Sequence, residues 1–276
     1  MALVQLAGTG SVAADVGCDH GYVSIYLAQK ELFSKIIAMD IRSGPLESAK
    51  RNIGIYQVAH RVETRLSDGA QALLENEADT LICAGMGGEL MIHILEQDWN
   101  KIRKMKKLIL QPQSEIHKVR CYLRENGFCI QNEDMVFEDG KYYPMMRAIP
   151  DSDTGRPGNA NATQISEIAV GAKEAGFEVQ MCQLETGAKE AGFESQLQLE
   201  DWYGPCLLKK NHPVLKQYLF HEKQVVSQIL EQLDAQLEKT KNEEGSAGFI
   251  RLSERKERME QKAQFLEEAL MFMQNH

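Results

Sequence analysis

The first residues able to bind a ligand stand in the stretch VAADVGCDHGY, at residues 12–22. Its apolar start is typical of a strand buried in a parallel sheet, and Asp15 lies near the end of that strand. Gly17 and Gly21 follow, where a chain leaves a strand and a ligand can approach bare backbone. A helix expected over residues 22–29 would direct its N-terminal amides into this loop. The spacing D-x-G-x-x-x-G is not the G-x-G-x-x-G dinucleotide fingerprint, so this loop alone is only a weak indication of a nucleotide site.

Polar or glycine-rich tips also end the next three predicted strands. These strands and tips are residues 36–39 before Asp40, 61–66 before Ser67-Asp68-Gly69, and 79–84 before Gly85-Met86-Gly87-Gly88. Asp40 comes about twenty residues past the glycine loop, where an acid can accept both hydroxyls of a ribose. Acids and glycines favour turns in any protein, but four such tips in succession are typical of the ligand-binding edge of an open parallel sheet.

The elements that must position these tips follow an α/β pattern. Leu46, Ala49, Ile53 and Tyr56 recur at helical spacing after Asp40 and should face the sheet, in a helix for which Ser43 is the expected N-cap. The remaining elements expected in this part are a helix over 89–96 with Leu90, Ile94 and Leu95 inward, a fifth strand over 107–110 ending at Gln111-Pro112, a helix capped by Ser114, and two strands over 128–136 and 142–149. This alternation predicts an α/β fold.

Composition divides the chain into three predicted parts: a domain over residues 1–150, an acidic insertion or linker over 151–201, and a helical hairpin over 202–276. The net charge is −9, and residues 151–200 alone hold 3 basic and 9 acidic side chains. GAKEAGFE occurs there twice, at 171–178 and 187–194, and suggests no chemistry. Apolar stripes over 212–242 and 248–275, joined by a glycine-containing turn, predict two antiparallel helices.

The same composition argues against several classes of protein. No apolar run is long enough to span a membrane, and the six cysteines form no CxxC pair, which is typical of reduced cytoplasmic thiols. The seven histidines are scattered, so no metal site is expected. Net negative charge disfavours nucleic-acid binding, yet basic runs at 101–107 and at Lys209-Lys210 could meet phosphate or simply be solvated.

Together, DVGCDHGY, AMDIRSGPLESAK, RLSDG, AGMGGEL, LILQPQSE and EDGKYYPMM resemble the bacterial tRNA (adenine-22-N1)-methyltransferases. The resemblance runs from about residue 12 to residue 149 and resumes at Tyr203-Gly204-Pro205. It implies a Rossmann-like class I methyltransferase sheet, parallel with a terminal antiparallel strand, and a C-terminal coiled coil that helps to hold tRNA. That family usually has a helical lead-in before the first strand, and the eleven residues here are short for it. If a segment is missing here, part of the wall over the cofactor is expected to be missing too.

The resemblance implies methyl transfer from S-adenosylmethionine to N1 of adenosine 22 in the tRNA D-loop. The implied cofactor-binding residues are Asp15, Gly17, Cys18, Asp19, His20, Gly21, Asp40, Ile41, Asp68, Gly69, Ala84, Gly85 and Met86. The implied target-base pocket consists of Tyr22, Met86, Gly87, Gly88, Gln111 and Pro112. Asp19 and His20 are the catalytic candidates, as acceptors toward the adenine amine, although His20 could instead only brace the loop. Tyr22 could stack on a flipped base or belong to the core.

Two other functions stay open. One is S-adenosylmethionine-dependent methylation of a small molecule, and the other is a non-catalytic RNA-binding protein on a methyltransferase fold. Adenine N1 has a free lone pair at neutral pH, so its methylation needs positioning more than a strong base, which suits a chain without a triad or paired-carboxylate motif. The hairpin could instead cap the sheet or mediate self-association.

Overall fold

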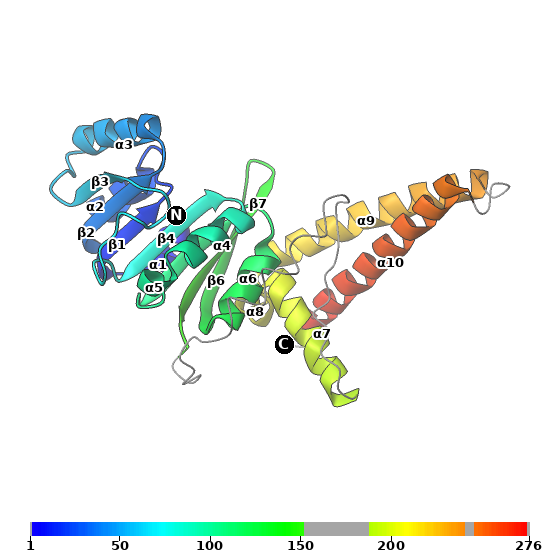
Figure 1. The fold of residues 1–276 in the computed structure, drawn as a ribbon. Coiled ribbons are helices and arrows are strands. Elements are labelled where there is room, and N and C mark those ends of the chain that lie inside the picture. Colours follow the sequence, from blue (N-terminus) through cyan, green and yellow to red (C-terminus); the bar gives the residue numbers. More distant parts are fainter. Residues whose placement is uncertain (1, 152–187, 241–245, 275–276) are drawn as a thin grey trace.

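The computed structural model describes residues 2–151, 188–240 and 246–274 (Figure 1). The predicted insertion therefore lies mostly outside the described residues, including the first GAKEAGFE copy. The elements in chain order are α1 (Ala2–Ala7), β1 (Gly10–Val16), α2 (Tyr22–Gln29), β2 (Phe33–Asp40), α3 (Ser43–Ile55), β3 (Val62–Leu66), β4 (Thr80–Met86), α4 (Gly88–Gln97), α5 (Trp99–Ile102), β5 (Lys107–Pro112), α6 (Ile116–Glu125), β6 (Phe128–Glu138), β7 (Lys141–Pro150), α7 (Ala188–Tyr203), α8 (Pro205–Lys209), α9 (Pro213–Lys239) and α10 (Ala247–Gln274).

Seven strands form one sheet in the order β3-β2-β1-β4-β5-β7-β6. β1 to β5 are parallel, and β7 runs antiparallel to both β5 and β6. This confirms the predicted five parallel strands followed by an antiparallel pair. The chain order reverses between β1 and β4, and the crevice outside the carboxyl ends at such a switch point is where open α/β sheets bind ligands.

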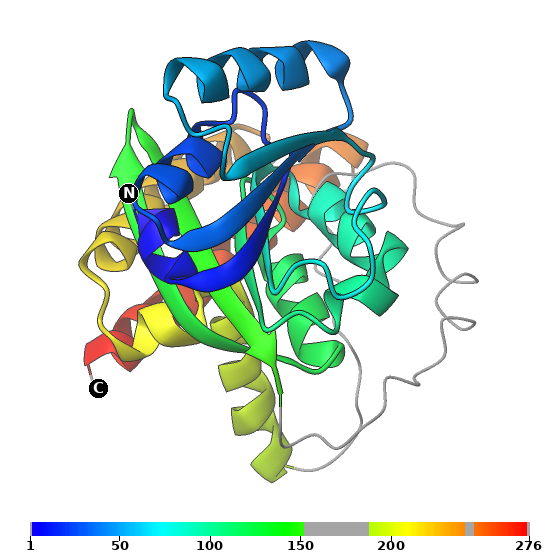
Figure 2. The ribbon, with the colours of Figure 1, turned by 90° about the vertical axis from the view of Figure 1, so that its left-hand side faces the viewer.

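Helices cover both faces of the sheet. Successive strand residues point to opposite sides, so a strand that is apolar throughout packs against both layers of helices. On β2, Ile37 and Met39 face the core under α4, α5 and α6, whereas Ile36 and Ala38 face the core under α1, α2 and α3. In Figure 2 the teal and green helices lie to the right of the strands and the blue α2 lies to the left. The sheet is thereby fixed in the middle layer, with only its edges and strand ends open.

The two long C-terminal helices form the predicted hairpin, and α9 and α10 lie side by side as they extend from the sheet (Figure 1). Leu219 and Val226 of α9 are buried in one apolar cluster with Leu266 of α10. Ion pairs between the helices flank this seam, with Nζ–carboxylate distances of 3.0 Å for Lys223–Glu267, 2.6 Å for Lys262–Glu222 and 2.7 Å for Lys256–Asp234. The hairpin is therefore held by a continuous apolar stripe with charges at its margin.

A buried ion pair joins the sheet to the segment that leads into the hairpin. Arg120 Nε donates to Glu133 Oε1 at 2.9 Å, and both side chains are almost fully buried. The same guanidinium donates to the carbonyls of Asp201 and Trp202, which end α7, each at 2.9 Å. Glu133 Oε2 accepts the amide of Cys206 at 2.9 Å, so one buried pair fixes both α7 and α8 against the sheet.

Two predicted inward-facing residues are wrong: Tyr56 follows the end of α3 and is 47% exposed, and Leu90 of α4 is 53% exposed. Two predicted helix caps are also wrong. The residue at the start of α3 is Arg42, with Ser43 already helical, and no side chain caps this helix. The residue before α6 is Glu115, in the left-handed conformation at φ 45°, and the Ser114 hydroxyl donates to the Glu115 carboxylate instead of receiving a helix amide. None of the described helices is long and apolar enough to cross a membrane.

Candidate active site

The loop between β1 and α2 is anchored on the neighbouring strand. The amides of Gly17 and Cys18 both donate to the carbonyl oxygen of Met39, each at 2.9 Å. Gly17 and Gly21 adopt φ of 74°, which a residue with a side chain rarely adopts. A Cβ atom on Gly17 would also lie 2.9 Å from the Met86 side chain. The β1 loop thus lies directly against the tip of β4, with only a glycine between them.

The carboxylate of Asp40 lies at the end of the adjacent strand, β2. Its Oδ2 accepts the amide of Asp19 at 3.2 Å, and its Oδ1 accepts the amide of Arg42 at 2.9 Å. The Asp40 carbonyl also accepts the amide of Ser67 at 3.0 Å, so the ends of β1, β2 and β3 are linked. A carboxylate has about four lone-pair positions. Two of them accept these amides, and the Arg42 Nε lies 3.9 Å from Oδ1 in an ion pair beyond hydrogen-bond distance, which leaves two acceptors for the hydroxyls of a ligand.

Asp15 lies beneath this loop and is almost fully buried. Burial raises its pKa to about 6, against the hydrogen bond that its Oδ2 accepts from the Ser24 hydroxyl at 2.6 Å, and repulsion from Asp40 adds to the rise. Asp40 is therefore close enough to affect the ionisation of Asp15. Burial also raises the pKa of the Cys18 thiol to about 12 and that of Cys83 further, so neither thiol is a nucleophile at neutral pH.

The third tip, Ser67-Asp68-Gly69, is a turn held by its own hydroxyl. Ser67 Oγ donates to the carbonyl of Gly69 at 2.9 Å and accepts the amide of Ala72 at 3.0 Å. Gly69 adopts φ of 55°, and the Asp68 side chain is exposed. Asp68 therefore points to solvent beside the Asp40 tip, unlike buried Asp15.

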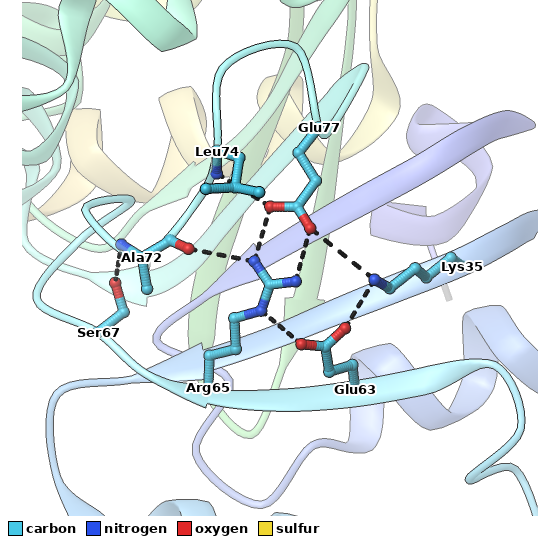
Figure 3. Close-up of polar contacts among 7 residues, drawn as sticks. All are labelled: Lys35, Glu63, Arg65, Ser67, Ala72, Leu74 and Glu77. Atoms are coloured by element: carbon cyan, nitrogen blue, oxygen red, sulfur yellow. Dashed lines mark hydrogen bonds and ion pairs between the residues drawn. The ribbon is translucent and has the colours of Figure 1, made fainter.

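An ion-pair network that sequence reasoning missed stabilises the chain after this turn (Figure 3). Arg65 donates to Glu77 at 2.6 and 2.7 Å, to Glu63 at 2.6 Å and to the carbonyl of Ala72 at 3.1 Å. Hydrogen bonds from Arg65 lower the pKa of both carboxylates to about 2. Glu77 also accepts the amide of Leu74 at 2.9 Å. The guanidinium therefore ties strand β3 to the segment that closes the Ser67–Gly69 turn.

The tip of β4 is shaped by the side chain of Gln111 on β5. Gln111 Oε1 accepts the amide of Gly85 at 3.0 Å, where φ is 79°, and the strand register shifts between Ala84 and Met86. Gly88 donates to the carbonyl of Ser114 at 3.0 Å, and a Cβ atom on Gly88 would lie 2.6 Å from that oxygen. Gln111, Pro112 and Gly88 are all buried and adjoin the tip: Gln111 bonds to Gly85, Pro112 pairs with Met86, and Gly88 begins α4 directly after the tip.

His20 and Tyr22 stand at the open side of the loop. His20 Nε2 lies 3.6 Å from the Asp19 carboxylate, both side chains are more than half exposed, and Asp19 adopts φ of 48°. The His20 carbonyl, rather than its ring, braces the loop by accepting the Asn52 amide at 3.0 Å. Tyr22 is 56% exposed, which excludes the alternative that it belongs to the core. We call the strand-end residues 15–22, 40–41, 67–69 and 84–88 together the rim. Ile41 is 60% exposed beside Asp40, so the rim has exposed apolar surface next to its acids.

The rim therefore combines carboxylate acceptors, bare glycine backbone and exposed apolar side chains at adjoining strand ends. Such a surface can hold and orient a nucleoside, but it offers no activated nucleophile. Among the residues that the structure describes, no three His, Cys, Asp or Glu side chains are grouped to hold a metal. Sequence reasoning missed Ser24, Asn52 and Arg65, because each acts through a partner that no local motif reveals.

Comparison with known proteins places the domain in a family. A family profile described as "Methyltransferase domain" matches residues 1–146. A curated Bacillus subtilis tRNA (adenine(22)-N(1))-methyltransferase is 36% identical over 139 residues, which is 50% of this chain and 58% of that protein. A putative tRNA methyltransferase of Mycoplasma genitalium is 31% identical over 134 residues, or 48% of this chain and 59% of that protein. The chain thus spans less than two thirds of these curated relatives.

Solved structures extend the likeness to the whole fold. The B. subtilis m1A22 tRNA methyltransferase is 25% identical, with a TM-score of 0.68 over 97% of this chain and 96% of that one. A Streptococcus pneumoniae protein described as a putative tRNA (m1A22) methyltransferase, in complex with S-adenosyl-L-methionine, is 24% identical, with a TM-score of 0.67 over 98% of each chain. An uncharacterised Listeria monocytogenes protein, 23% identical, has a TM-score of 0.72 over 98% of each chain. With the family profile matching more than half of its length, the chain belongs to the methyltransferase domain family.

Proposed function

We propose that this protein transfers a methyl group from S-adenosylmethionine to N1 of adenosine 22 in tRNA. The observation that carries the proposal is the Asp40 carboxylate, buried at a strand end with two acceptor positions unused. A ribose offers two adjacent hydroxyls, which suit such an acceptor. The name of the B. subtilis relative supports the tRNA substrate and the position of the target base.

The rim residues fit S-adenosylmethionine. Asp40 would hold its ribose, exposed Ile41 would cover one face of its adenine, and Asp68 with Gly69 would meet the adenine edge. Asp15, Gly17, Cys18, Asp19, His20 and Gly21 would surround its methionine part, with Ala84, Gly85 and Met86 alongside. The bound cofactor supplies a methyl group activated by a sulfonium. Glycine at position 17 keeps the loop and Met86 close enough to enclose it.

Besides binding the cofactor, the protein would need only to orient an adenine whose N1 is already nucleophilic. The N1 lone pair is free at neutral pH, so the reaction depends on alignment rather than on a base. Tyr22 is exposed and free to stack on the flipped base, and Met86 with Gly87 would form the floor. Gln111, Pro112 and Gly88 would border that floor. Asp19, which lies beside His20, would accept the proton that the exocyclic amine releases.

Under this proposal, each part of the chain has a separate role. Residues 1–150 would form the cofactor-binding methyltransferase domain, 151–201 an insertion or linker, and 202–276 the arm that positions tRNA. A tRNA substrate would place the reaction in the cytoplasm. Self-association through the hairpin is the competing role for the arm, and sedimentation of the free protein and of its tRNA complex distinguishes the two.

The test is methyl transfer from labelled S-adenosylmethionine to bacterial tRNA, followed by mass mapping of the modified nucleoside. The expected product is N1-methyladenosine at position 22, with no label on a tRNA carrying guanosine there. Label on other nucleotides, or none on any tRNA while the cofactor binds normally, would overturn the substrate assignment.

The cofactor site is tested separately by Asp40→Ala. Losing two charge-assisted hydrogen bonds should weaken cofactor binding by roughly a hundredfold, measured by calorimetry. Glu47→Ala is the matched control, since that carboxylate is exposed on α3 and pairs with Lys50. It should bind the cofactor as the wild type does. Equal affinity for Asp40→Ala and Glu47→Ala would show that Asp40 does not hold the ribose.

A further inference from the structure

Two pockets that share Tyr142 lie next to the rim and take no part in the site described above. The first, of about 470 Å³, lies between β6, β7 and helices α6 to α9, with Gln113 and Lys141 at its lining and the rings of Tyr142, Trp202 and Tyr218 around it. The second, of about 460 Å³, is lined on the other side of Tyr142 by Phe137, Phe220 and His221. We call the two together the aromatic trough.

Strand register makes the aromatic trough a continuation of the rim. Met86 at the tip of β4 pairs with Pro112 of β5, and the next residue, Gln113, donates its amide to the Met86 carbonyl at 2.9 Å. β5 pairs with β7 antiparallel, with Leu110 opposite Met146. The carboxyl end of β5 therefore faces the start of β7, where Tyr142 stands. One edge of the sheet thus passes from the proposed target-base floor into the trough.

The lining of the aromatic trough favours flat, uncharged rings. Tyr142 lies 5.1 Å from Tyr218 and 4.6 Å from Phe137, measured between ring centroids. Burial raises the pKa of Tyr218 to about 12, so its hydroxyl stays a hydrogen-bond donor at neutral pH. Phe220, on the hairpin helix α9, is 47% exposed. The trough therefore offers aromatic rings, a phenol hydroxyl and the side-chain amide of exposed Gln113, which match the faces and edges of nucleobases.

The charges of the trough also suit RNA. The Arg120 guanidinium at the base is paired with the Glu133 carboxylate and also donates to two carbonyls, so it offers no unpaired charge to a ligand. Lys141 at the first pocket is exposed and makes no ion pair with any residue in the described parts of the chain. One cation beside an aromatic surface is the arrangement that holds unstacked bases while meeting their backbone phosphate.

The geometry points to the aromatic trough as the site that takes the unpaired nucleobases flanking the target adenosine, stacked on Tyr142 and Phe220, with a phosphate at Lys141. This inference rests on the proposed function and deepens it. It assigns the target base to the rim and its neighbours to the junction between the sheet and the hairpin. It also gives the hairpin a chemical role, because α9 contributes Phe220 and Tyr218 to the trough.

The test uses the full chain and Phe220→Ala, since Phe220 is half exposed and its loss should not affect folding. Loss of one stacked base should raise the KM for tRNA by on the order of tenfold, with kcat at saturating tRNA and cofactor affinity unchanged. Phe220→Trp should restore the KM. Ile250→Ala is the matched control, because Ile250 is 48% exposed on the same hairpin and lines neither pocket.

Two further measurements distinguish base stacking and phosphate contact from an indirect effect on the hairpin. A tRNA with 2-aminopurine beside the target adenosine should lose fluorescence on binding the wild type and retain it on binding Phe220→Ala. Lys141→Ala should reduce the salt dependence of tRNA binding by about one charge. If the wild type methylates no tRNA, the proposed function fails and this inference with it. If the wild type methylates tRNA but Phe220→Ala keeps its KM and quenches 2-aminopurine, or only changes its oligomeric state, the inference alone is overturned.

Discussion

Replacing Gly204 with alanine would place a methyl group 2.5 Å from both carboxylate oxygens of Glu133. Gly204 adopts φ of 92°, a backbone conformation that residues with a side chain rarely adopt. Glu133 cannot move away freely, because it is held by Arg120 Nε and by the amide of Cys206, each at 2.9 Å. The substitution therefore acts on the pair that joins the sheet to α7 and α8.

The cost has two parts. Backbone strain at such a position is about 1–3 kcal/mol. Breaking a buried ion pair by removing one partner costs about 3–5 kcal/mol. A displaced Glu133 would lose its bond to Cys206 but keep part of its contact with Arg120, so only a fraction of that second figure applies. We expect Gly204→Ala to lower the free energy of unfolding by roughly 2–4 kcal/mol, because it weakens the contacts of the Arg120–Glu133 pair with α7 and α8.

The assay is a double-mutant cycle with Glu133→Ala, followed by urea unfolding and by hydrogen exchange at the Cys206 amide. In the Glu133→Ala background the steric conflict is absent, so adding Gly204→Ala should cost only the backbone strain. The two substitutions should therefore be non-additive by more than the ~0.5 kcal/mol typical of independent sites. Gly54→Ala is the control: Gly54 lies in α3 with no atom within 4 Å, and alanine there should stabilise by up to about 1 kcal/mol.

Function should change selectively. Under the proposed function, Gly204→Ala should raise the KM for tRNA and leave cofactor affinity unchanged, because the Arg120–Glu133 pair positions the hairpin and not the strand ends proposed to bind the cofactor. Additive free energies in the cycle, or a urea midpoint for Gly204→Ala equal to that of the wild type, would refute the claim that glycine is required beside Glu133.

Two further predictions concern the rim. Asp15 has a folded pKa raised to about 6, so the folded state binds its proton more tightly and Asp15 makes stability fall as pH rises from about 4 to about 6. Asp15→Asn should therefore gain stability over the wild type across that window, by up to about 3 kcal/mol at pH 7 in urea unfolding, and a pH-independent difference would contradict this. Arg65→Met should release the segment that Glu77 holds. Hydrogen exchange of the Ala72 and Leu74 amides should then be faster, and the free energy of unfolding should fall by about 1–2 kcal/mol. Unchanged exchange would show that the network does not hold the turn.

The fold was predictable because its signal is local. Buried parallel strands give short apolar runs, and their tips give acids and glycines at regular intervals, so all seven strands and the helical hairpin followed from the sequence. The caps failed for a tertiary reason. Ser114 lies in the β5–α6 loop, where its carbonyl accepts the Gly88 amide and its hydroxyl donates to Glu115. The loop is therefore bonded to the start of α4, and the Ser114 hydroxyl does not cap α6.

The candidate site was predictable only where one residue acts from its own strand end. Asp15 and Asp40 could be placed in order because each ends an apolar run. The hydrogen bond from Gly85 to Gln111 could not, because it joins residues 26 apart across two strands. The same holds for Glu133 and Cys206, 73 residues apart, whose contact explains why glycine stands at position 204. Such pairs become visible only when the sheet register is known.

The two halves of the rim differ in charge, and under the proposed function this difference has a physical reason. The ends of β1, β2 and β3 carry Asp15, Asp40 and Asp68, whereas the ends of β4, β5 and the start of β7 carry glycine, methionine, glutamine, proline and tyrosine. A sulfonium cofactor is cationic, so acids beside it stabilise binding. An attacking adenine is neutral, and an ionised acid next to N1 itself would favour protonation of N1, which removes the reacting lone pair; Asp19 is proposed to lie at the exocyclic amine instead. Placing the three strand-end carboxylates Asp15, Asp40 and Asp68 on β1, β2 and β3 therefore favours cofactor binding without setting an acid from the ends of β4 or β5 against N1.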